Sequence, residues 1–204
     1  MWGIDPTRLH WAPNAVDTSQ FNMTSADSHE NVTFIGRLEA WKGVRTFLQV
    51  AKLVTAEIQD VRFLVAGEGS LRHDLERNSS DINVKFLGQV HHQDVPRVLA
   101  ETAVLVLPSY MEGLPTVCLE ALASAVPVVA SNVGGTSEIV RNEETGFLFE
   151  AGDAPSCAKA VLRLLSDERL RRKMGRNGRR LVQTSYSWET VVRRIETIYD
   201  SMVK

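Results

Sequence analysis

The chain has 204 residues, of which 44% are hydrophobic and 24% charged, with a formal net charge of −2 at pH 7. This composition is typical of a folded globular protein with one substantial core or two smaller ones, and it argues against a disordered chain. Because the net charge is small, any phosphate site must be built from locally placed cations and backbone amides, and no nucleic-acid partner is expected. Two cysteines, no apolar run long enough to span a bilayer and no signal-peptide pattern favour a reducing, cytoplasmic setting.

Short apolar segments rich in β-branched residues recur along the chain and alternate with segments of helical pattern. The expected strands cover residues 32–36, 61–66, 84–87, 104–107, 126–130 and 146–149. The expected helices cover residues 43–57, 71–77, 94–102, 115–125, 135–140, 154–166, 168–184 and 188–202. Strands that are apolar throughout are buried on both faces, and each interval leaves room for a crossover helix. The sequence therefore predicts an α/β protein, with a Rossmann-like three-layer αβα fold around a parallel sheet of about six strands.

Glycines and polar residues follow the expected strands. They are Gly36-Arg37, Gly67-Glu68-Gly69, Gly88-Gln89, Pro108-Ser109 and the segment 131–135. A single glycine usually does no more than end a strand. In open α/β sheets, however, ligands bind at the carboxyl ends of the strands, so the whole set predicts a binding site at that edge.

The helix expected at residues 115–125 contains one charged residue, Glu120, among apolar neighbours. A buried carboxylate needs a partner, and the bland alternative for Glu120 is a structural ion pair. Pro115 suits the first helical position and would leave the next three backbone amides free for an anion. Glu112 and Glu120 both offer acceptors for hydroxyl groups. The alternative for Glu112 is an ordinary carboxylate in a turn. A phosphate site beside hydroxyl acceptors suggests a nucleotide sugar.

In their order along the chain, these motifs resemble the C-terminal, donor-binding lobe of the family 4 (group 1) retaining glycosyltransferases, which have the two-lobed GT-B fold. The motifs are Phe34-Ile35-Gly36-Arg37-Leu38 with Lys42-Gly43, segment 64–69, Phe86-Leu87-Gly88, Leu107-Pro108-Ser109, segment 112–123, segment 127–130, and Gly134-Gly135 with Glu138-Ile139-Val140. Each motif is weak alone, but the ordered set covers nearly the whole chain. Family members often have glycine where Ala15 and Ala125 stand here.

The resemblance assigns roles to individual residues. Arg37 and Lys42 match the residues that hold the donor diphosphate, Glu112 matches one that contacts the transferred sugar, and Glu120 matches one that contacts ribose hydroxyls. Arg37, Lys42 and Glu112 are thus the predicted catalytic residues. The predicted donor-binding residues are Gly36, Arg37, Lys42, Val90, Glu112, Gly113, Leu114, Pro115, Thr116 and Glu120, with Val90 beside the base. The alternative for Arg37 and Lys42 is a pair of solvated surface charges.

The function implied is retaining transfer of a hexosyl group from a nucleoside-diphosphate sugar to a saccharide or lipid-linked acceptor, as in polysaccharide biosynthesis, with no metal or cofactor. The domain prediction has three parts: residues 1–20 as a connector from a missing N-terminal acceptor lobe, 21–185 as the nucleotide-sugar-binding domain, and 186–204 as a helix reaching toward that lobe. The chain alone is then expected to be inactive in transfer. The alternative is a stand-alone, non-catalytic nucleotide-binding module.

Other motifs favour other functions less well. Gly67-Glu68-Gly69 resembles the start of a dinucleotide fingerprint, but Arg72 stands where its third glycine is required. His91 and His92 lack a third ligand at metal spacing and are interpreted as solvated residues near a helix start.

Two features bear on partners. A basic stretch between Arg169 and Arg180 is either a solvated helix face or a surface that docks on an anionic leaflet, which would place the protein peripherally on the inner face of the cytoplasmic membrane. An apolar stripe from Trp188 to Met202 either packs on its own domain or is exposed for the missing lobe, and exposure would favour a homodimer.

Overall fold

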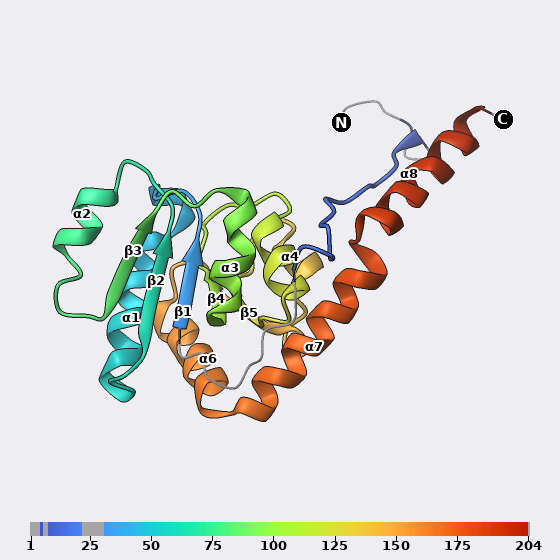
Figure 1. Ribbon diagram of the computed structural model, residues 1–204. Helices are drawn as coiled ribbons and strands as arrows, with labels where there is room; N and C mark the ends of the chain where they lie inside the picture. The colour runs from blue at the N-terminus through green and yellow to red at the C-terminus, as the bar shows by residue number, and fades with distance from the viewer. Residues whose placement is uncertain (1–4, 6–7, 22–30, 204) are drawn as a thin grey trace.

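The computed structural model of the protein describes residues 5, 8–21 and 31–203. Its centre is a six-stranded sheet with the strand order β3-β2-β1-β4-β5-β6 (Figure 1). All neighbouring strands are parallel. The strands are β1 (Asn31–Ile35), β2 (Arg62–Ala66), β3 (Val84–Gly88), β4 (Thr102–Leu107), β5 (Val128–Ser131) and β6 (Gly146–Phe149). This order and the parallel pairing confirm the predicted fold class.

Helices cover both faces of the sheet. They are α1 (Val44–Glu57), α2 (Arg72–Arg77), α3 (Val95–Ala100), α4 (Thr116–Ala123), α5 (Thr136–Ile139), α6 (Ala154–Ser166), α7 (Glu168–Ser185) and α8 (Trp188–Val203). Two short 3₁₀ turns, η2 (Ala40–Lys42) and η3 (His92–Asp94), precede α1 and α3. The core on one face joins α1 and α6 to the sheet, and the core on the other joins α3, α4 and α7 to it.

Strand β4 shows how the sequence builds both cores. Each of its residues is buried. Val104 and Val106 pack in the core with α1, whereas Leu105 and Leu107 pack in the core with α4. Successive side chains of a strand point to opposite faces, so a strand covered on both sides must be apolar throughout, as predicted here.

Each predicted strand and helix has a counterpart in the structure, with boundaries that shift by no more than two residues, and two of these shifts have a clear physical cause. The helix expected at residues 94–102 ends earlier, because Thr102 is the first residue of β4, where its hydroxyl lies 2.7 Å from the Thr33 hydroxyl and donates to the carbonyl of Val98. Pro115 is not the first helical residue. It has extended ψ (109°) and precedes α4 as its N-cap.

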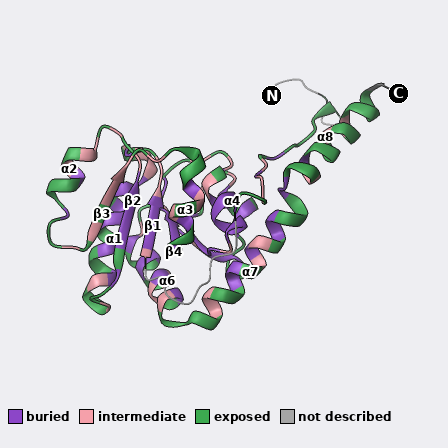
Figure 2. Ribbon diagram, viewed as in Figure 1, coloured by how far each residue is buried: buried purple, intermediate pink, exposed green. Residues whose placement is uncertain are grey.

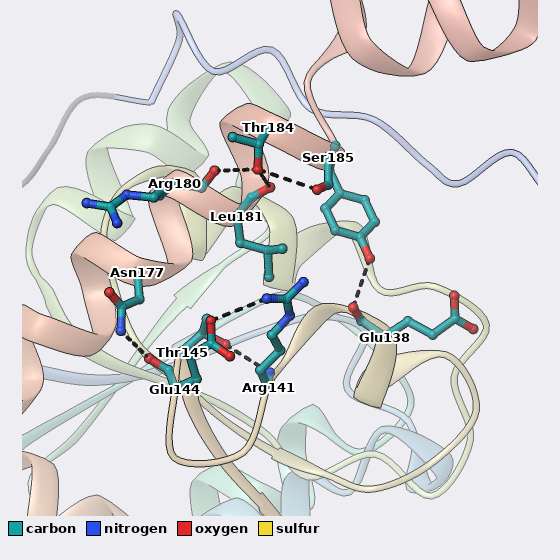
Figure 3. A network of polar contacts seen from close by, with 10 residues as sticks. Glu138, Arg141, Glu144, Thr145, Asn177, Arg180, Leu181, Thr184 and Ser185 are labelled. Carbon is teal, nitrogen blue, oxygen red and sulfur yellow. Dashed lines mark hydrogen bonds and ion pairs between the residues drawn. The ribbon is translucent and has the colours of Figure 1, made fainter.

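A polar network holds α7 against the loops at the end of the sheet (Figure 3). The side-chain amide of Asn177 donates to the carbonyl of Glu144 at 3.0 Å, and the hydroxyl of Tyr186 donates to the carbonyl of Glu138 at 2.8 Å. Within the loop, Thr145 accepts from the amide of Arg141. The C-terminal half of α7 is therefore fixed to the segments that follow β5.

Helix α8 begins at a cap and then leaves the body of the domain (Figure 1). The Ser187 hydroxyl caps the helix by accepting from the Thr190 amide at 3.3 Å, and a bridge joins Ser187 to Val16. Val191 is buried, but Tyr199 is 64% exposed, and Figure 2 shows most of α8 as exposed. The predicted apolar stripe is thus largely uncovered among the described residues. Residues 1–4 and 6–7 of the predicted connector and 22–30 of the predicted domain lie outside them.

Candidate functional site

The loops after the strands meet at the carboxyl edge of the sheet, as the sequence predicted. A cavity of about 400 Å³ opens there. Its walls come from the ends of β1, β2 and β3, and the lining residues are Ile35, Gly36, Arg37, Ala66, Gly67, Glu68, Gln89 and Val90. Three predicted donor-binding residues, Gly36, Arg37 and Val90, therefore line one cavity.

Two glycines, Gly43 from the Lys42-Gly43 motif and Gly134 from the segment after β5, hold the loops together by close backbone contact. Gly43 has φ of 68°, and a Cβ atom on it would lie 1.8 Å from the carbonyl oxygen of Pro108. Gly134 has φ of 51°, and a Cβ atom on it would lie 1.8 Å from the carbonyl oxygen of Glu112. Only glycine combines this backbone conformation with such an approach. Gly134 therefore does more than end a strand, because it and Gly43 fix the position of the loop that carries Glu112.

Lys42 and Glu112, two predicted catalytic residues, form an ion pair. The Nζ atom of Lys42 lies 2.7 Å from Oε1 of Glu112, with side-chain exposures of 16% and 7%. The hydroxyl of Ser109 donates to the same Oε1 atom at 2.6 Å, and the carbonyl of Ser109 accepts from Ser131. Within the part of the chain that the structure describes, Oε2 of Glu112 has no hydrogen-bond donor, so it can accept one.

Arg37 lies at the outer margin of this pair and is exposed. The ring of Trp41 connects the two cations, since Cζ of Arg37 lies 4.8 Å and Nζ of Lys42 lies 4.5 Å from its centroid. The carbonyl of Trp41 in turn accepts from the amide of Tyr110, which ties η2 to the loop after β4. A cation–π contact of this kind is worth about 0.5–1 kcal/mol at an exposed site and orients both side chains.

The start of α4 offers fewer donors than predicted. Because Pro115 is the N-cap, its carbonyl accepts from the amide of Cys118 at 3.1 Å. Among the described residues, the amides of Thr116 and Val117 have no such partner. Two amides, rather than three, point out of the helix start, and the positive end of the helix dipole adds to their attraction for an anion. Leu114, just before, has its carbonyl held by the side-chain amide of Asn14 at 2.8 Å.

Glu120 is 8% exposed on α4, as predicted for a carboxylate within an apolar helix. Its neighbour is His92, whose Nδ1 atom lies 3.6 Å from Oε1 of Glu120. Burial raises the pKa of Glu120, and the nearby His92 lowers it. His92 is 72% exposed just before α3, which confirms the expectation of a solvated residue near a helix start, and it also faces this carboxylate. Within the described residues, no group of three His, Cys, Asp or Glu side chains could hold a metal ion.

A comparison with known protein families shows to which family this chain belongs. The sequence model of the family described as "Glycosyl transferases group 1" matches residues 16–181. The chain belongs to the group 1 glycosyltransferases. The matched segment includes every residue assigned to the predicted site.

Individual relatives of this group 1 glycosyltransferase support the family assignment. The chain is 32% identical to a UDP-Gal:alpha-D-GlcNAc-diphosphoundecaprenol alpha-1,3-galactosyltransferase of Escherichia coli, over 98% of this chain and 56% of the relative. It is 31% identical to a GDP-mannose-dependent monoacylated alpha-(1-6)-phosphatidylinositol monomannoside mannosyltransferase of Corynebacterium glutamicum, over 98% and 58%. The chain thus spans about half the length of the curated relatives it matches.

A solved structure supports the same assignment. Sucrose-phosphate synthase from Thermosynechococcus elongatus superposes with a TM-score of 0.82 and 29% identity, over 95% of this chain and 52% of that protein. The six-stranded parallel sheet and the matched half-length are those of the C-terminal domain of a GT-B glycosyltransferase.

Three site residues of this group 1 glycosyltransferase were not assigned from the sequence: Trp41, His92 and Ser109. Ser109 belongs to a predicted strand end, but nothing in its neighbours indicates that it binds Glu112. Trp41 lies beside Lys42 in an unpredicted 3₁₀ turn. The contact between His92 in η3 and Glu120 in α4 joins two segments far apart in the sequence, so no local pattern indicates it.

Proposed function

We propose that this domain binds a nucleoside-diphosphate sugar at the carboxyl edge of its sheet, and that the complete enzyme transfers the hexosyl group with retention to a saccharide or lipid-linked acceptor. The observation that carries the proposal is the convergence of the Lys42–Glu112 pair, the start of α4 and the buried Glu120 around one edge. The names of the two relatives, one with UDP-Gal and one with GDP-mannose as donor, support this donor class and leave the base open.

The geometry suggests how the donor is held. The diphosphate would lie between Arg37, Lys42 and the free amides at the start of α4, where cations and a helix N-terminus attract it. Lys42 now contacts Glu112 and would turn toward the phosphates when they arrive. The same cations would stabilise the negative charge that develops on the departing nucleoside diphosphate. These groups can supply that positive charge without a metal ion, and we propose a metal-independent reaction.

The two carboxylates would accept hydrogen bonds from the hydroxyl groups of the donor. Glu120, near His92 on α4, would accept from the ribose hydroxyls, while Val90, which lines the cavity, would lie beside the base. Glu112, with Oε2 open, would accept from the transferred sugar, and the backbone from Gly113 to Thr116 would complete the contacts. A buried carboxylate that accepts two hydroxyl groups recovers the hydrogen bonds it lost on burial.

The decisive experiment removes the proposed diphosphate cation. Lys42→Ala should weaken binding of UDP or GDP, whichever the chain binds, by roughly tenfold or more, because a hydrogen bond to a charged group is worth about 1.5–3 kcal/mol. Binding of the bare nucleoside should change far less. Isothermal titration calorimetry measures both affinities.

Lys52→Ala is the matched control, since Lys52 lies on α1 and pairs with Asp81 at 2.9 Å, away from the edge. If Lys42→Ala lost equal affinity for the nucleoside diphosphate and for the nucleoside, Lys42 would not contact the phosphates. Added chelator should leave the affinity of the unmodified chain unchanged.

Catalysis by the complete enzyme separates this proposal from a stand-alone nucleotide-binding module. Both bind the nucleotide, but only an enzyme releases nucleoside diphosphate and glycosylated acceptor. We propose that transfer requires the acceptor lobe, so this chain alone should bind the donor without transferring the sugar. The exposed side of α8, with Trp188, Val192, Tyr199 and Met202 each more than 40% exposed, is the surface we propose for that lobe or, in its absence, for a homodimer.

We also propose that the protein binds the surface of an anionic membrane through α7. Arg169, Lys173, Arg176 and Arg180 recur at helical spacing and are exposed, and in the described part of the chain none of them has an acidic partner. The names of both relatives refer to lipid-linked acceptors, which fits a peripheral location. Among the described residues, every helix is too short or too polar to cross a bilayer.

A further inference from the structure

His92 approaches the buried carboxylate of α4 from outside the helix. Its side chain is 72% exposed and that of Glu120 is 10% exposed, yet Nδ1 and Oε1 lie 3.6 Å apart. The carbonyl of His91 accepts from the amide of Asp94 at 2.8 Å, and this bond fixes the backbone of η3, where His92 lies. The exposed imidazole therefore lies beside the buried carboxylate of Glu120.

The separation is suited to an electrostatic contact rather than to a hydrogen bond. Hydrogen bonds between nitrogen and oxygen span about 2.7–3.2 Å, so at 3.6 Å the imidazole does not occupy an acceptor position of the carboxylate. Both oxygens of Glu120 stay available for hydroxyl donors. A charge on His92 would nevertheless act on Glu120 at this distance, because the carboxylate is largely removed from water.

Other charged groups near this helix have different partners or positions. They are Lys42 paired with Glu112 before α4, Arg37 and Glu68 at the cavity margin, Asp94 in η3, and Arg179, which donates to the carbonyl of Ala123 at the far end of α4. The forces on the Glu120 carboxyl are burial, which raises its pKa, and His92, which lowers it. His92 is thus the charge that bears on this carboxylate.

We propose that His92 is a positioning residue of the donor site, which keeps Glu120 ionised and free to accept the ribose hydroxyls as the solution becomes acidic. This proposal rests on the assignment of Glu120 to the ribose in the proposed function. It adds a residue outside the predicted donor site and a pH range in which that residue matters.

The sign of the pH effect follows from the two charges. As the pH falls, Glu120 takes up a proton, becomes a poorer acceptor and loses affinity for ribose. A positive charge on the imidazole of His92, 3.6 Å from the carboxylate, would oppose that protonation. Without His92 the carboxylate should protonate at higher pH, whereas well above the range in which Glu120 takes up its proton the loss of His92 should have little effect.

The test compares His92→Gln with His91→Gln, its exposed neighbour on the same loop, for which no side-chain contact to Glu120 exists in the described structure. Affinity for UDP and for GDP is measured by calorimetry at pH 8 and pH 5.5. We expect His92→Gln to bind like the unmodified chain at pH 8 and about three- to fivefold more weakly at pH 5.5, the range of an ion pair with one exposed partner. His91→Gln should follow the unmodified chain at both values.

A second measurement needs no nucleotide. The carboxyl carbon of Glu120, assigned by its loss in Glu120→Gln, is titrated by ¹³C NMR in the free chain. Its midpoint should move to higher pH in His92→Gln and stay in place in His91→Gln. An unchanged midpoint in His92→Gln overturns the proposal, as do parallel affinity profiles in the two histidine variants.

The same variants separate this inference from the proposed function. If Glu120→Gln leaves nucleotide affinity unchanged, the ribose assignment itself is wrong. If Glu120→Gln weakens binding while His92→Gln behaves like His91→Gln, the donor site stands and only the role of His92 fails. Melting temperatures of all variants report folding, which an exposed His92 should not affect.

Discussion

Ala125 connects α4 to β5 with φ of 60°, a left-handed conformation that favours glycine. Ala125→Gly should stabilise the domain by about 0.5–1 kcal/mol, because relief of the left-handed alanine outweighs the added freedom of the unfolded chain. For a domain of this size the melting temperature should rise by roughly 1–4 °C. Differential scanning calorimetry measures the change.

Ala160→Gly serves as the control because it deletes the same methyl group within the regular helix α6. There glycine should destabilise by about 1 kcal/mol, since the helical conformation suits alanine. If both substitutions lower stability alike, the backbone of Ala125 is not strained.

Single site residues could be predicted from the sequence where local chemistry singled them out. Glu120 is conspicuous because it is the one charge in an apolar helix, and Lys42 and Glu112 each lie in a motif at a strand end. Their direct contact was not predictable, because it joins residues 70 positions apart through the seating of two loops. Ser109 and His92 depend on the same tertiary placement, and their own neighbours give no local signal.

At the scale of elements, the loop that carries Glu112 depends on Gly134 after β5. Gly134→Ala should destabilise the domain by about 2–4 kcal/mol, from a left-handed alanine and from the displacement that its Cβ imposes on the carbonyl of Glu112. Affinity for the nucleoside diphosphate should fall as well, because the partner of Lys42 moves. Urea unfolding and calorimetry measure the two effects.

Gly113→Ala is the matched substitution in the same loop. A Cβ atom on Gly113 would meet no other atom within 4 Å, and its φ is not positive. Stability should therefore change by less than about 1 kcal/mol. A comparable loss in both variants would show that the loop is sensitive to any side chain rather than to the contact at Gly134.

Elements were predicted well because their signals are local. Fully apolar runs mark strands that are covered on both faces, and the period of α6 and α7 marks their buried sides. The predicted boundaries were wrong where tertiary contacts decide where an element begins or ends. Thr102 joins the sheet through its bond to Thr33. Pro115 becomes a cap because the preceding loop is held by Gly134 and Gly135. Because Pro115 is the cap, two backbone amides at the start of α4 are free, rather than the three predicted.

At the scale of the whole molecule, α7 carries both structural cations and exposed cations. Its inner side packs on α4, where Gly175 and Gly178 allow close approach to Ala125 and Leu122. Arg171 and Arg179 donate to backbone carbonyls of the domain, so they are not available to a membrane. The four exposed cations defined above remain for the outer side. The basic stretch of the sequence thus divides into structural cations and a surface stripe, a division that only the packing of the helix reveals.

The stripe predicts salt-sensitive binding to anionic vesicles. Lys173→Glu combined with Arg176→Glu should weaken binding to vesicles that contain phosphatidylglycerol by about 2 kcal/mol or more, roughly thirtyfold, since each surface cation contributes about 1 kcal/mol. Arg62→Glu with Lys85→Glu, an exposed pair on β2 and β3, makes the same change in net charge and should have little effect. Cosedimentation at low and high salt measures both, because screening must abolish the difference. Equal losses in the two double variants would mean that net charge, and not the α7 stripe, attracts the membrane, and no binding at low salt would exclude the membrane as a partner of this domain.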